Sequence, residues 1–293
     1  MNVLVTGAFG RAGSAIIEYL DPQPEYDLTF LDRAQHPDHD AVIASITDKK
    51  AIRPAFDGQD AVIHLAASAP QLGTSVPWAE IVEHNILGLH TVLEAAQDAN
   101  VQTFIFASSN HVVGTLVDPH VPQVYDPAYE LMIDHTVPPH PRSPYGVSKV
   151  FGEAFGRYHV DHEDAIQQWY SLRLCGVRFA EDDHPYGDAE RGVREGRWER
   201  DSLEYWTQVA KRKATGTSRR DFAHMIECCL VDDHVDYEPF FVVSDNDARW
   251  FDIDHARNTI GYAPRDNLNA WEGPLPDEIP SRVPADMPDW IPR

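Results

Sequence analysis

The chain has 293 residues, with 47 acidic against 24 basic side chains and a formal net charge of −23. Nucleic acids and anionic membrane surfaces require a basic face, so this charge argues against both as partners. The length suits one large α/β domain or two smaller ones with a sizeable core. We hypothesise a salt-rich cytoplasm, where salt screens the acidic repulsion. Folding that is lost in dilute buffer and recovered in molar KCl would support this hypothesis.

Cysteine content and hydropathy exclude further classes of protein. Three cysteines predict no disulfide framework, and the sequence contains neither CxxC nor HExxH, so we predict no metal site. Cys228 and Cys229 lie in an apolar helical stretch and are expected to be buried thiols. No apolar run reaches the about 18 residues of a membrane-spanning helix, and no signal peptide is recognisable. We therefore expect a cytoplasmic protein.

Apolar runs and helical patterns alternate through the first 175 residues. Strands are expected at 2–6, 27–31, 61–65, 102–107 and 168–174. Helical patterns separate them, at about 11–20, 47–56, 80–97 and 144–160. This alternation predicts a Rossmann-type, doubly wound parallel α/β sheet.

The character of the sequence changes after residue 175. Residues 181–216 are charged and suggest a loop, followed by a helix at 221–230, a strand at 239–244 and a helix at 252–260. We interpret 176–273 as a small C-terminal α/β substrate-binding lobe laid on the edge of the sheet.

Two segments show little periodicity. The stretch 114–144 is rich in proline and histidine, which predicts a long loop that is either functional or disordered. The acidic tail 274–293 has a proline at every fourth position, which excludes a helix. Either this tail is disordered, or it extends over the surface with Trp290 as an anchor.

A glycine-rich turn joins the first strand to the first helix. Gly7 permits the tight turn, Gly10 lets the backbone approach a pyrophosphate at the helix N-terminus, and Gly13 lets the helix pack on the strand. Asp32, at the end of the second strand, is placed to accept the ribose hydroxyls of NAD; the alternative is a turn-forming aspartate. Arg33 could instead accept the 2′-phosphate of NADP. We favour NAD and assign residues 1–175 to an NAD-binding Rossmann domain.

A second motif, Tyr145-x-x-x-Lys149, carries the chemistry. Residues four apart on a helix share one face. A phenol has a pKa of about 10, and a neighbouring ammonium lowers it. Tyr145 can then take a proton from a substrate hydroxyl, while Ser109 holds the same hydroxyl by a hydrogen bond.

The glycine turn, Ser109 and the Tyr145/Lys149 pair together resemble the extended short-chain dehydrogenase/reductase family. His64-Leu65-Ala66-Ala67 is similar to the motif after the family's third cofactor-side strand. Several further stretches resemble uronate dehydrogenases and the NAD-dependent glucose-6-phosphate and aldose dehydrogenases of halophilic archaea: 106–111, 145–153, 227–229, 244–247 and 261–262.

This resemblance implies an NAD-dependent enzyme that oxidises the C1 hydroxyl of an aldose, a sugar phosphate or a uronate to the lactone. Catalysis would use Ser109, Tyr145 and Lys149, with Asn85 organising a water that links Lys149 to solvent. NAD would be bound by Gly7, Gly10, Arg11, Gly13, Asp32, Ser45, Ile46, Leu65, Ala66, Ala67, Tyr145 and Lys149. The sugar would be contacted by Ser68, Asn110, His111 and Arg200.

Several alternatives stay open at this point. Ser45 stands where relatives carry an aspartate beside the adenine, which leaves the adenine contact in doubt. His111 is either a sugar ligand or a neutral, hydrogen-bonded core histidine. A nucleotide-sugar epimerase or dehydratase on the same scaffold is the competing enzyme class, and a non-catalytic NAD sensor is a third class. The resemblance also implies that the helices bearing Asn85 and Tyr145 pair between subunits in many relatives, so a homo-oligomer is an open expectation.

The source of a counter-charge for an anionic sugar is also open. Four arginines recur at every third position in 191–200, and Arg219 and Arg220 follow. We favour a solvated stripe that pairs with Glu190, Glu195 and Glu199. One of Arg200, Arg219 or Arg220 reaching the sugar is the alternative.

Overall fold

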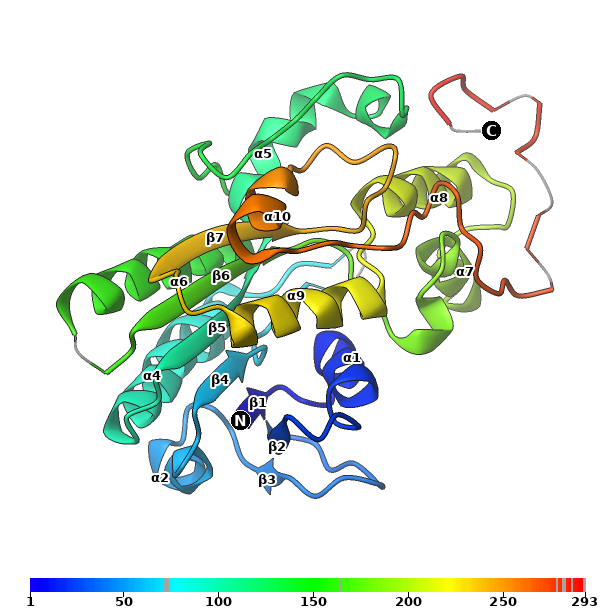
Figure 1. Ribbon diagram of the computed structural model, residues 1–293. Helices are drawn as coiled ribbons and strands as arrows, with labels where there is room; N and C mark the ends of the chain where they lie inside the picture. Colours follow the sequence, from blue (N-terminus) through cyan, green and yellow to red (C-terminus); the bar gives the residue numbers. More distant parts are fainter. Residues whose placement is uncertain (71–73, 164, 278, 281–282, 286, 292–293) are drawn as a thin grey trace.

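The computed structural model describes residues 1–70, 74–163, 165–277, 279–280, 283–285 and 287–291. Seven parallel strands form one sheet in the order β3-β2-β1-β4-β5-β6-β7 (Figure 1). Their bounds are β1 Asn2–Thr6, β2 Asp27–Asp32, β3 Val42–Ile43, β4 Ala61–His64, β5 Thr103–Ser109, β6 Gln168–Leu174 and β7 Tyr237–Val242. The predicted doubly wound sheet is confirmed. Its strand order reverses between β1 and β4, where such sheets bind ligands.

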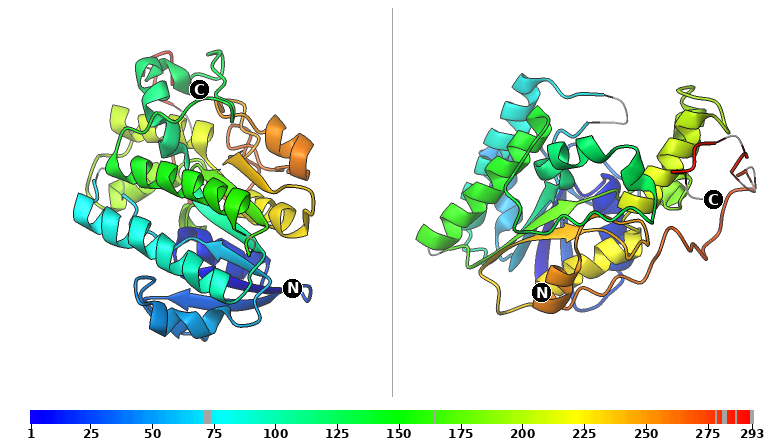
Figure 2. Two further views of the ribbon diagram at one scale, coloured as in Figure 1. Left: turned by 90° about the vertical axis from the view of Figure 1, so that its left-hand side faces the viewer. Right: turned by 90° about the horizontal axis from the view of Figure 1, so that it is seen from above.

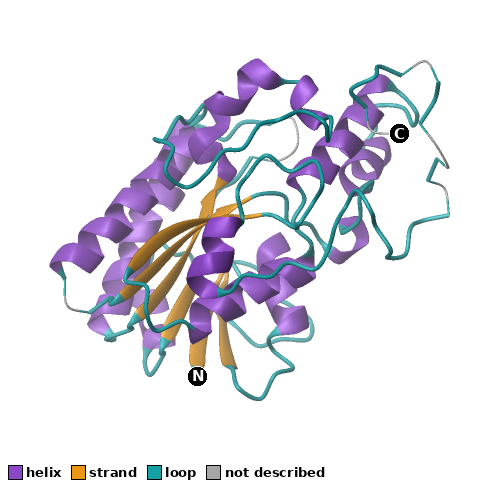
Figure 3. Ribbon diagram, turned by 45° about the horizontal axis from the view of Figure 1, so that its top comes forward, coloured by secondary structure: helices purple, strands orange, loops and turns teal. Residues whose placement is uncertain are grey.

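Helices cover both faces of the sheet (Figures 2 and 3). Helices α1 and α9 share one apolar core with one face of the sheet, and α2, α4 and α6 share a second core with the other. The helices are α1 Arg11–Tyr19, α2 Lys49–Ile52, α3 Trp78–Glu80, α4 Gly88–Asp98, α5 Gly114–Val117, α6 Pro144–His162, α7 Gly187–Arg194, α8 Leu203–Thr215, α9 Arg219–Val231 and α10 Asp254–Ile260.

Helix α6 is the element that carries the Tyr145/Lys149 pair. It begins where the Ser143 side chain accepts the Gly146 N–H at 3.1 Å, with Pro144 in the first turn. The helix approaches the sheet closely, since a Cβ added at Gly156 would lie 2.0 Å from the ring of Trp169. Any larger residue at Gly156 would therefore push the helix, and with it the reactive pair, away from β6.

A buried ion pair fixes the same helix to two strands. Glu153 of α6 accepts two hydrogen bonds from Arg173 of β6, each 2.9 Å long, and one of 2.6 Å from the Ser108 hydroxyl of β5. Glu153 is 6% exposed and Arg173 is 3% exposed. Side chains of α6, β5 and β6 thus meet at Ser108, the residue before Ser109, which is the last residue of β5.

The C-terminal half differs from the prediction in two respects. The strand predicted in a separate lobe is β7, which pairs with β6 in the main sheet, so the sheet continues past residue 175. The stretch 181–216, predicted as a loop, contains α7 and α8. These helices bury an apolar cluster that includes Tyr205 and Trp206, while their charged residues pair with one another. Several of the charges that suggested a solvated loop form ion pairs within the fold.

The less periodic segments also have defined positions. The stretch 114–144 forms short helical turns, among them α5. In the tail, Ile291 is buried against α7 and α8, and the Trp290 ring lies 6.0 Å from that of Tyr125. The described part of the tail therefore follows the extended alternative; residues 278, 281–282, 286 and 292–293 lie outside the described residues.

The described ranges contain neither a membrane-spanning helix nor a cluster of metal ligands. No helix there has the length and apolarity to cross a membrane. No group of three or more histidine, cysteine or acidic side chains there could hold a metal ion. The three cysteines are free, and Cys228 and Cys229 are buried as predicted.

Candidate active site

A cavity of about 290 Å³ opens at the carboxyl ends of β1, β2 and β4, where the strand order reverses. Most of the residues predicted to bind NAD line this cavity, so a single ligand could contact them together. The lining includes Gly7, Gly10, Asp32, Arg33, Ser45, Ile46, Leu65, Ala66, Ala67, Ser68 and His84. We call this space the cofactor cavity.

The glycine turn forms the floor of the cofactor cavity. Gly7 has φ +71°, and a Cβ there would lie 2.7 Å from the Ala66 nitrogen. A Cβ at Gly13 would lie 2.2 Å from the Ala8 carbonyl oxygen, so only glycine lets α1 pack this closely on the turn. No side chain caps the N-terminus of α1 at Gly10. Its first N–H groups are therefore available to a pyrophosphate.

Asp32 and Ser45 line the part of the cavity where we predict the adenosine of NAD to bind. The Asp32 carboxylate accepts the Phe9 N–H and the Ala34 N–H, each at 3.0 Å, and so also shapes the turn. A carboxylate has further lone pairs for ribose hydroxyls, so both interpretations of Asp32 are compatible. The Ser45 hydroxyl hydrogen-bonds the Thr47 hydroxyl at 2.8 Å. These residues and the glycine turn fit NAD.

Tyr145, Ser109 and Lys149 form the reactive cluster. Tyr145 lies close enough to Ser109 for the serine side chain to lower its pKa, and the Lys149 Nζ lies 5.4 Å from the Tyr145 ring centroid and 4.9 Å from that of Phe106. Burial raises the pKa of Tyr145 to about 12, against the opposing effects of the Ser109 side chain and of Arg11. Burial also lowers the pKa of Lys149 to about 7. Both groups are thus driven toward their neutral forms.

Asn85 connects the cofactor cavity to this cluster. It lies in a π-helical stretch, Ile81–Leu87. Its amide accepts the Ser68 N–H at 2.7 Å and donates to the Ser68 carbonyl at 3.0 Å and to the Ser148 hydroxyl at 3.1 Å. Ser148 is the neighbour of Lys149, so Asn85 positions the reactive helix; its predicted water-holding role stays a prediction. His84, which the sequence analysis missed, hydrogen-bonds the Ser68 hydroxyl at 2.9 Å.

His111 stands beside the reactive tyrosine. Its ring meets that of Tyr145 edge-on at 5.4 Å between centroids. Burial lowers the pKa of His111 to about 4, so the ring is neutral near pH 7. Its Nδ1 is buried without a hydrogen-bond partner among the described residues, unlike a satisfied core histidine. Asn110 Oδ1 lies 3.4 Å from the Ser109 hydroxyl, which keeps both predicted sugar ligands next to the reactive cluster.

A cationic side of the site was missed from the sequence. Lys211 of α8 and Arg142 lie near enough to His111 to lower its pKa by their charges. Burial lowers the pKa of Lys211 itself, although the residue is exposed to solvent. Within the described ranges we find no hydrogen bond or ion pair for the Lys211 ammonium, whereas Arg142 pairs with Asp118. The helical pattern at 203–215 was the sequence signal that could have identified Lys211 as a candidate.

The predicted arginine stripe is largely engaged in ion pairs. Arg200 binds both oxygens of Glu190, at 3.1 and 2.6 Å, and Arg197 pairs with Glu195. Glu190 is buried, so these pairs belong partly to the interior and not to a solvated surface. The assignment of Arg200 to the sugar stays a prediction that now competes with Lys211.

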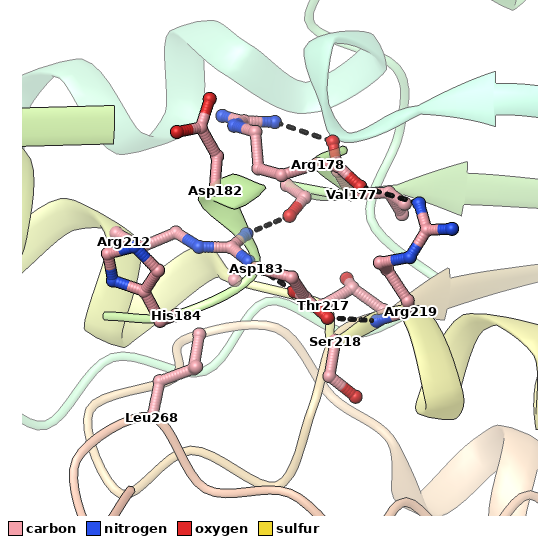
Figure 4. Close-up of polar contacts among 12 residues, drawn as sticks. Val177, Arg178, Asp182, Asp183, His184, Arg212, Thr217, Ser218, Arg219 and Leu268 are labelled. Atoms are coloured by element: carbon pink, nitrogen blue, oxygen red, sulfur yellow. Dashed lines mark hydrogen bonds and ion pairs between the residues drawn. The ribbon is translucent and has the colours of Figure 1, made fainter. Parts of the chain in front are cut away.

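Arg219 and Arg220, the other candidates, have partners away from the reactive cluster. Arg219 reaches Glu18 and Ser14 of α1, and Arg220 pairs with Asp266. Figure 4 shows Asp183 between two arginines: it accepts the Arg219 backbone N–H and the side chain of the buried Arg212, both at 2.9 Å. This network ties α8 and α9 to the first helix of the cofactor cavity.

Comparisons with known proteins agree with this geometry. The family model of the NAD dependent epimerase/dehydratase family matches residues 3–236. An NAD-dependent glucose-6-phosphate dehydrogenase of Haloferax volcanii is 36% identical over 277 residues, covering 90% of this chain and 93% of that protein. An L-arabinose 1-dehydrogenase (NAD(P)(+)) of the same organism is 32% identical, covering 91% and 97%.

The solved structures show the same likeness. The crystal structure of uronate dehydrogenase from Agrobacterium tumefaciens matches with a TM-score of 0.70 and 26% identity, covering 94% of this chain and 91% of that one. The match of the family model over most of the sequence, the seven-stranded sheet and the glycine turn agree. The chain belongs to the NAD dependent epimerase/dehydratase family.

Proposed function

We propose that this chain is an NAD-dependent sugar dehydrogenase that oxidises the C1 hydroxyl of an aldose to the lactone. The observation that carries the proposal is the cluster of Tyr145, the neighbouring Ser109 and a buried Lys149, whose Nζ lies 5.4 Å from the Tyr145 ring centroid. Asn85 joins this cluster to the cofactor cavity through Ser68. The glucose-6-phosphate and L-arabinose dehydrogenases named above support the substrate class.

Oxidation of the sugar removes a hydride from C1 and a proton from its hydroxyl group, and each residue of the cluster has one role in this reaction. Tyr145 takes the hydroxyl proton, and Ser109 holds the oxygen in line by a hydrogen bond. Arg11 stabilises the phenolate by its positive charge, and Lys149 does the same when it is protonated. NAD⁺, when bound, accepts the hydride and supplies the redox chemistry. Because Tyr145 acts deprotonated, turnover rises with pH until its proton is lost.

The first prediction tests the reaction class. With free aldoses and NAD⁺ in molar salt, we expect NADH absorbance to grow, and Tyr145→Phe should reduce kcat by about 10²–10⁴-fold because the base is lost. The Phe variant should keep its thermal unfolding midpoint and its affinity for ADP, which serves as the control. Turnover of a UDP- or dTDP-sugar without NADH from any free aldose would instead establish the epimerase or dehydratase alternative.

The second prediction concerns the buried amine. Lys149→Met should abolish turnover yet raise the free energy of unfolding near pH 7 by a few kcal/mol, since folding buries an ammonium. The folded-state pKa of Lys149 is about 7, well below that of the unfolded chain. Between about pH 10.5 and 7, Lys149 is therefore protonated in the unfolded chain but neutral in the folded chain, so the unfolded chain binds one more proton.

The sign of the pH dependence follows from this proton. The stability advantage of Lys149→Met should be small near pH 10.5, grow as pH falls, and become constant below about pH 7. Denaturant unfolding of both proteins across this range measures it, and other titrating groups cancel in the difference. An advantage that does not vary with pH would show that the amine is not buried as described.

We further propose that the substrate is an anionic aldose held by Lys211, with Arg142 nearby. Support comes from the exposed but crowded position of Lys211, its lack of a partner within the described ranges, and its closeness to His111. A sugar phosphate or a uronate would provide the missing anion. The glucose-6-phosphate dehydrogenase similarity agrees with the first of these.

The third prediction separates Lys211 from Arg200. Lys211→Met should raise KM for glucose 6-phosphate and glucuronate by about 10- to 100-fold through loss of a charge-assisted bond, and leave KM for L-arabinose nearly unchanged. Lys213→Met, on the same helix, is the matched control and should change neither. If KM for the anionic sugars rises only in Arg200→Met, the anion is bound by Arg200, the residue expected from the sequence.

We also propose a homo-oligomer built on α6 and the neighbouring helix that carries Asn85. Val82 and Leu87 are exposed on that helix, and Val147 and Tyr158 are exposed on α6. Exposed apolar side chains on neighbouring helices are of the kind that subunits bury. A monomer mass by light scattering in molar salt would contradict this.

A further inference from the structure

The last described segment of the chain, residues 287–291, contacts two separate apolar cores. It lies beside α7 and α8 (red in Figure 1). Ile291 is 2% exposed and is buried in one cluster with Tyr205 and Val209 of α8. Trp290 packs against this cluster and also against the core between the sheet and α9. One short segment thus joins parts of the fold that are distant in sequence.

The first contact of this segment supports the helix that carries Lys211. Val209 is 3% exposed and faces Ile291, whereas Lys211, two residues further along α8, is exposed. Packing on the apolar face of a helix determines where the side chains on its other faces lie. Ile291 therefore helps to fix the position of the Lys211 ammonium near His111.

The second contact supports the segment that carries Arg142. The Trp290 ring lies 6.0 Å from the ring of Tyr125, which is 7% exposed. Burial raises the pKa of Tyr125, the charge of Arg142 lowers it and that of Asp118 raises it. The buried ring of Tyr125 therefore lies close to the ion pair of Arg142 and Asp118. Trp290 packs on the support of this second cation.

We propose that Trp290 and Ile291 are positioning residues of the anion site, which hold Lys211 and Arg142 at the spacing that the anionic group of the sugar requires. This inference rests on the proposed function and assigns the tail a part in substrate selection. A tail that only stabilised the fold would affect every sugar alike. A neutral aldose has no need of the two cations, so its binding distinguishes the two roles.

Steady-state kinetics with two sugars test the proposal. Trp290→Ala should raise KM for glucose 6-phosphate by about 10-fold, through partial loss of a charge-assisted contact, and leave KM for L-arabinose within about twofold. Trp290→Phe keeps an aromatic ring against Tyr125 and should restore the wild-type KM. Trp271→Ala is the matched control, because its indole donates to the Pro274 carbonyl at 3.4 Å and belongs to neither core. It should change neither KM.

A double-mutant cycle shows whether Trp290 acts through Lys211. In the Lys211→Met background, Trp290→Ala should raise KM for glucose 6-phosphate much less than in the wild-type chain, because residues that act through one another have non-additive effects. Equal increases in both backgrounds would contradict the proposal. So would equal increases in KM for glucose 6-phosphate and L-arabinose in Trp290→Ala.

Hydrogen exchange provides a test that needs no turnover. Trp290→Ala should speed amide exchange in 123–125 and 203–215 and leave exchange in β1 and β4 unchanged, because only the two supported segments loosen. Unchanged exchange in both segments would overturn the proposal. Should Trp290→Ala fail to fold, Ile291→Val removes one methyl group from the α8 cluster and allows the same comparisons.

Failure of the proposed function would be recognised separately. If the wild-type chain oxidises no sugar with NAD⁺, the dehydrogenase proposal fails. Calorimetric titration of glucose 6-phosphate into the wild-type and Trp290→Ala chains then decides the role of the tail: weaker binding in the variant supports it, and equal binding contradicts it.

Discussion

The geometry of the site depends on the buried pair of Glu153 and Arg173. Two charges withdrawn from water are stable only when their geometry is good and their remaining donors and acceptors are satisfied. Glu153 meets that condition with three hydrogen bonds, from Arg173 and Ser108. On Arg173, Nη1 is buried without a hydrogen-bond partner among the described residues, and the guanidinium lies 5.2 Å from the Phe241 ring centroid. Because α6 carries Tyr145 and Lys149 while β5 ends at Ser109, this single junction fixes all three reactive side chains relative to one another.

Because acidic residues outnumber basic ones, a basic side chain without an ion pair indicates a possible binding site for an anion. Where carboxylates are abundant, an ion pair forms readily, so a cation without one is informative. The Lys211 ammonium is such a cation, and it lies near His111. In the function that we propose, the anionic substituent of the sugar neutralises it.

The parts that could be predicted from the sequence are those set by local pattern. The alternation of strands and helices located most elements of the sheet, and the spacing of Gly7, Gly10 and Gly13 located the turn that the structure places at the cofactor cavity. What was missed depends on partners distant in sequence. Residues 181–216 looked like a solvated loop because their ion pairs cannot be counted before the fold is known. Lys211 was hidden for the same reason.

Burial of the reactive cluster disfavours the charged forms that the reaction needs, and positive charges nearby must counter this effect. A hydride transfers best in a site without water, yet the same burial raises the pKa of Tyr145 and lowers that of Lys149, so both groups favour neutrality. A neutral phenol cannot accept a proton. Each additional positive charge at the cluster shifts the balance toward the phenolate, and Arg11 already acts in that direction. A cationic nicotinamide would act in the same direction, which would make the base strongest when the hydride acceptor is in place.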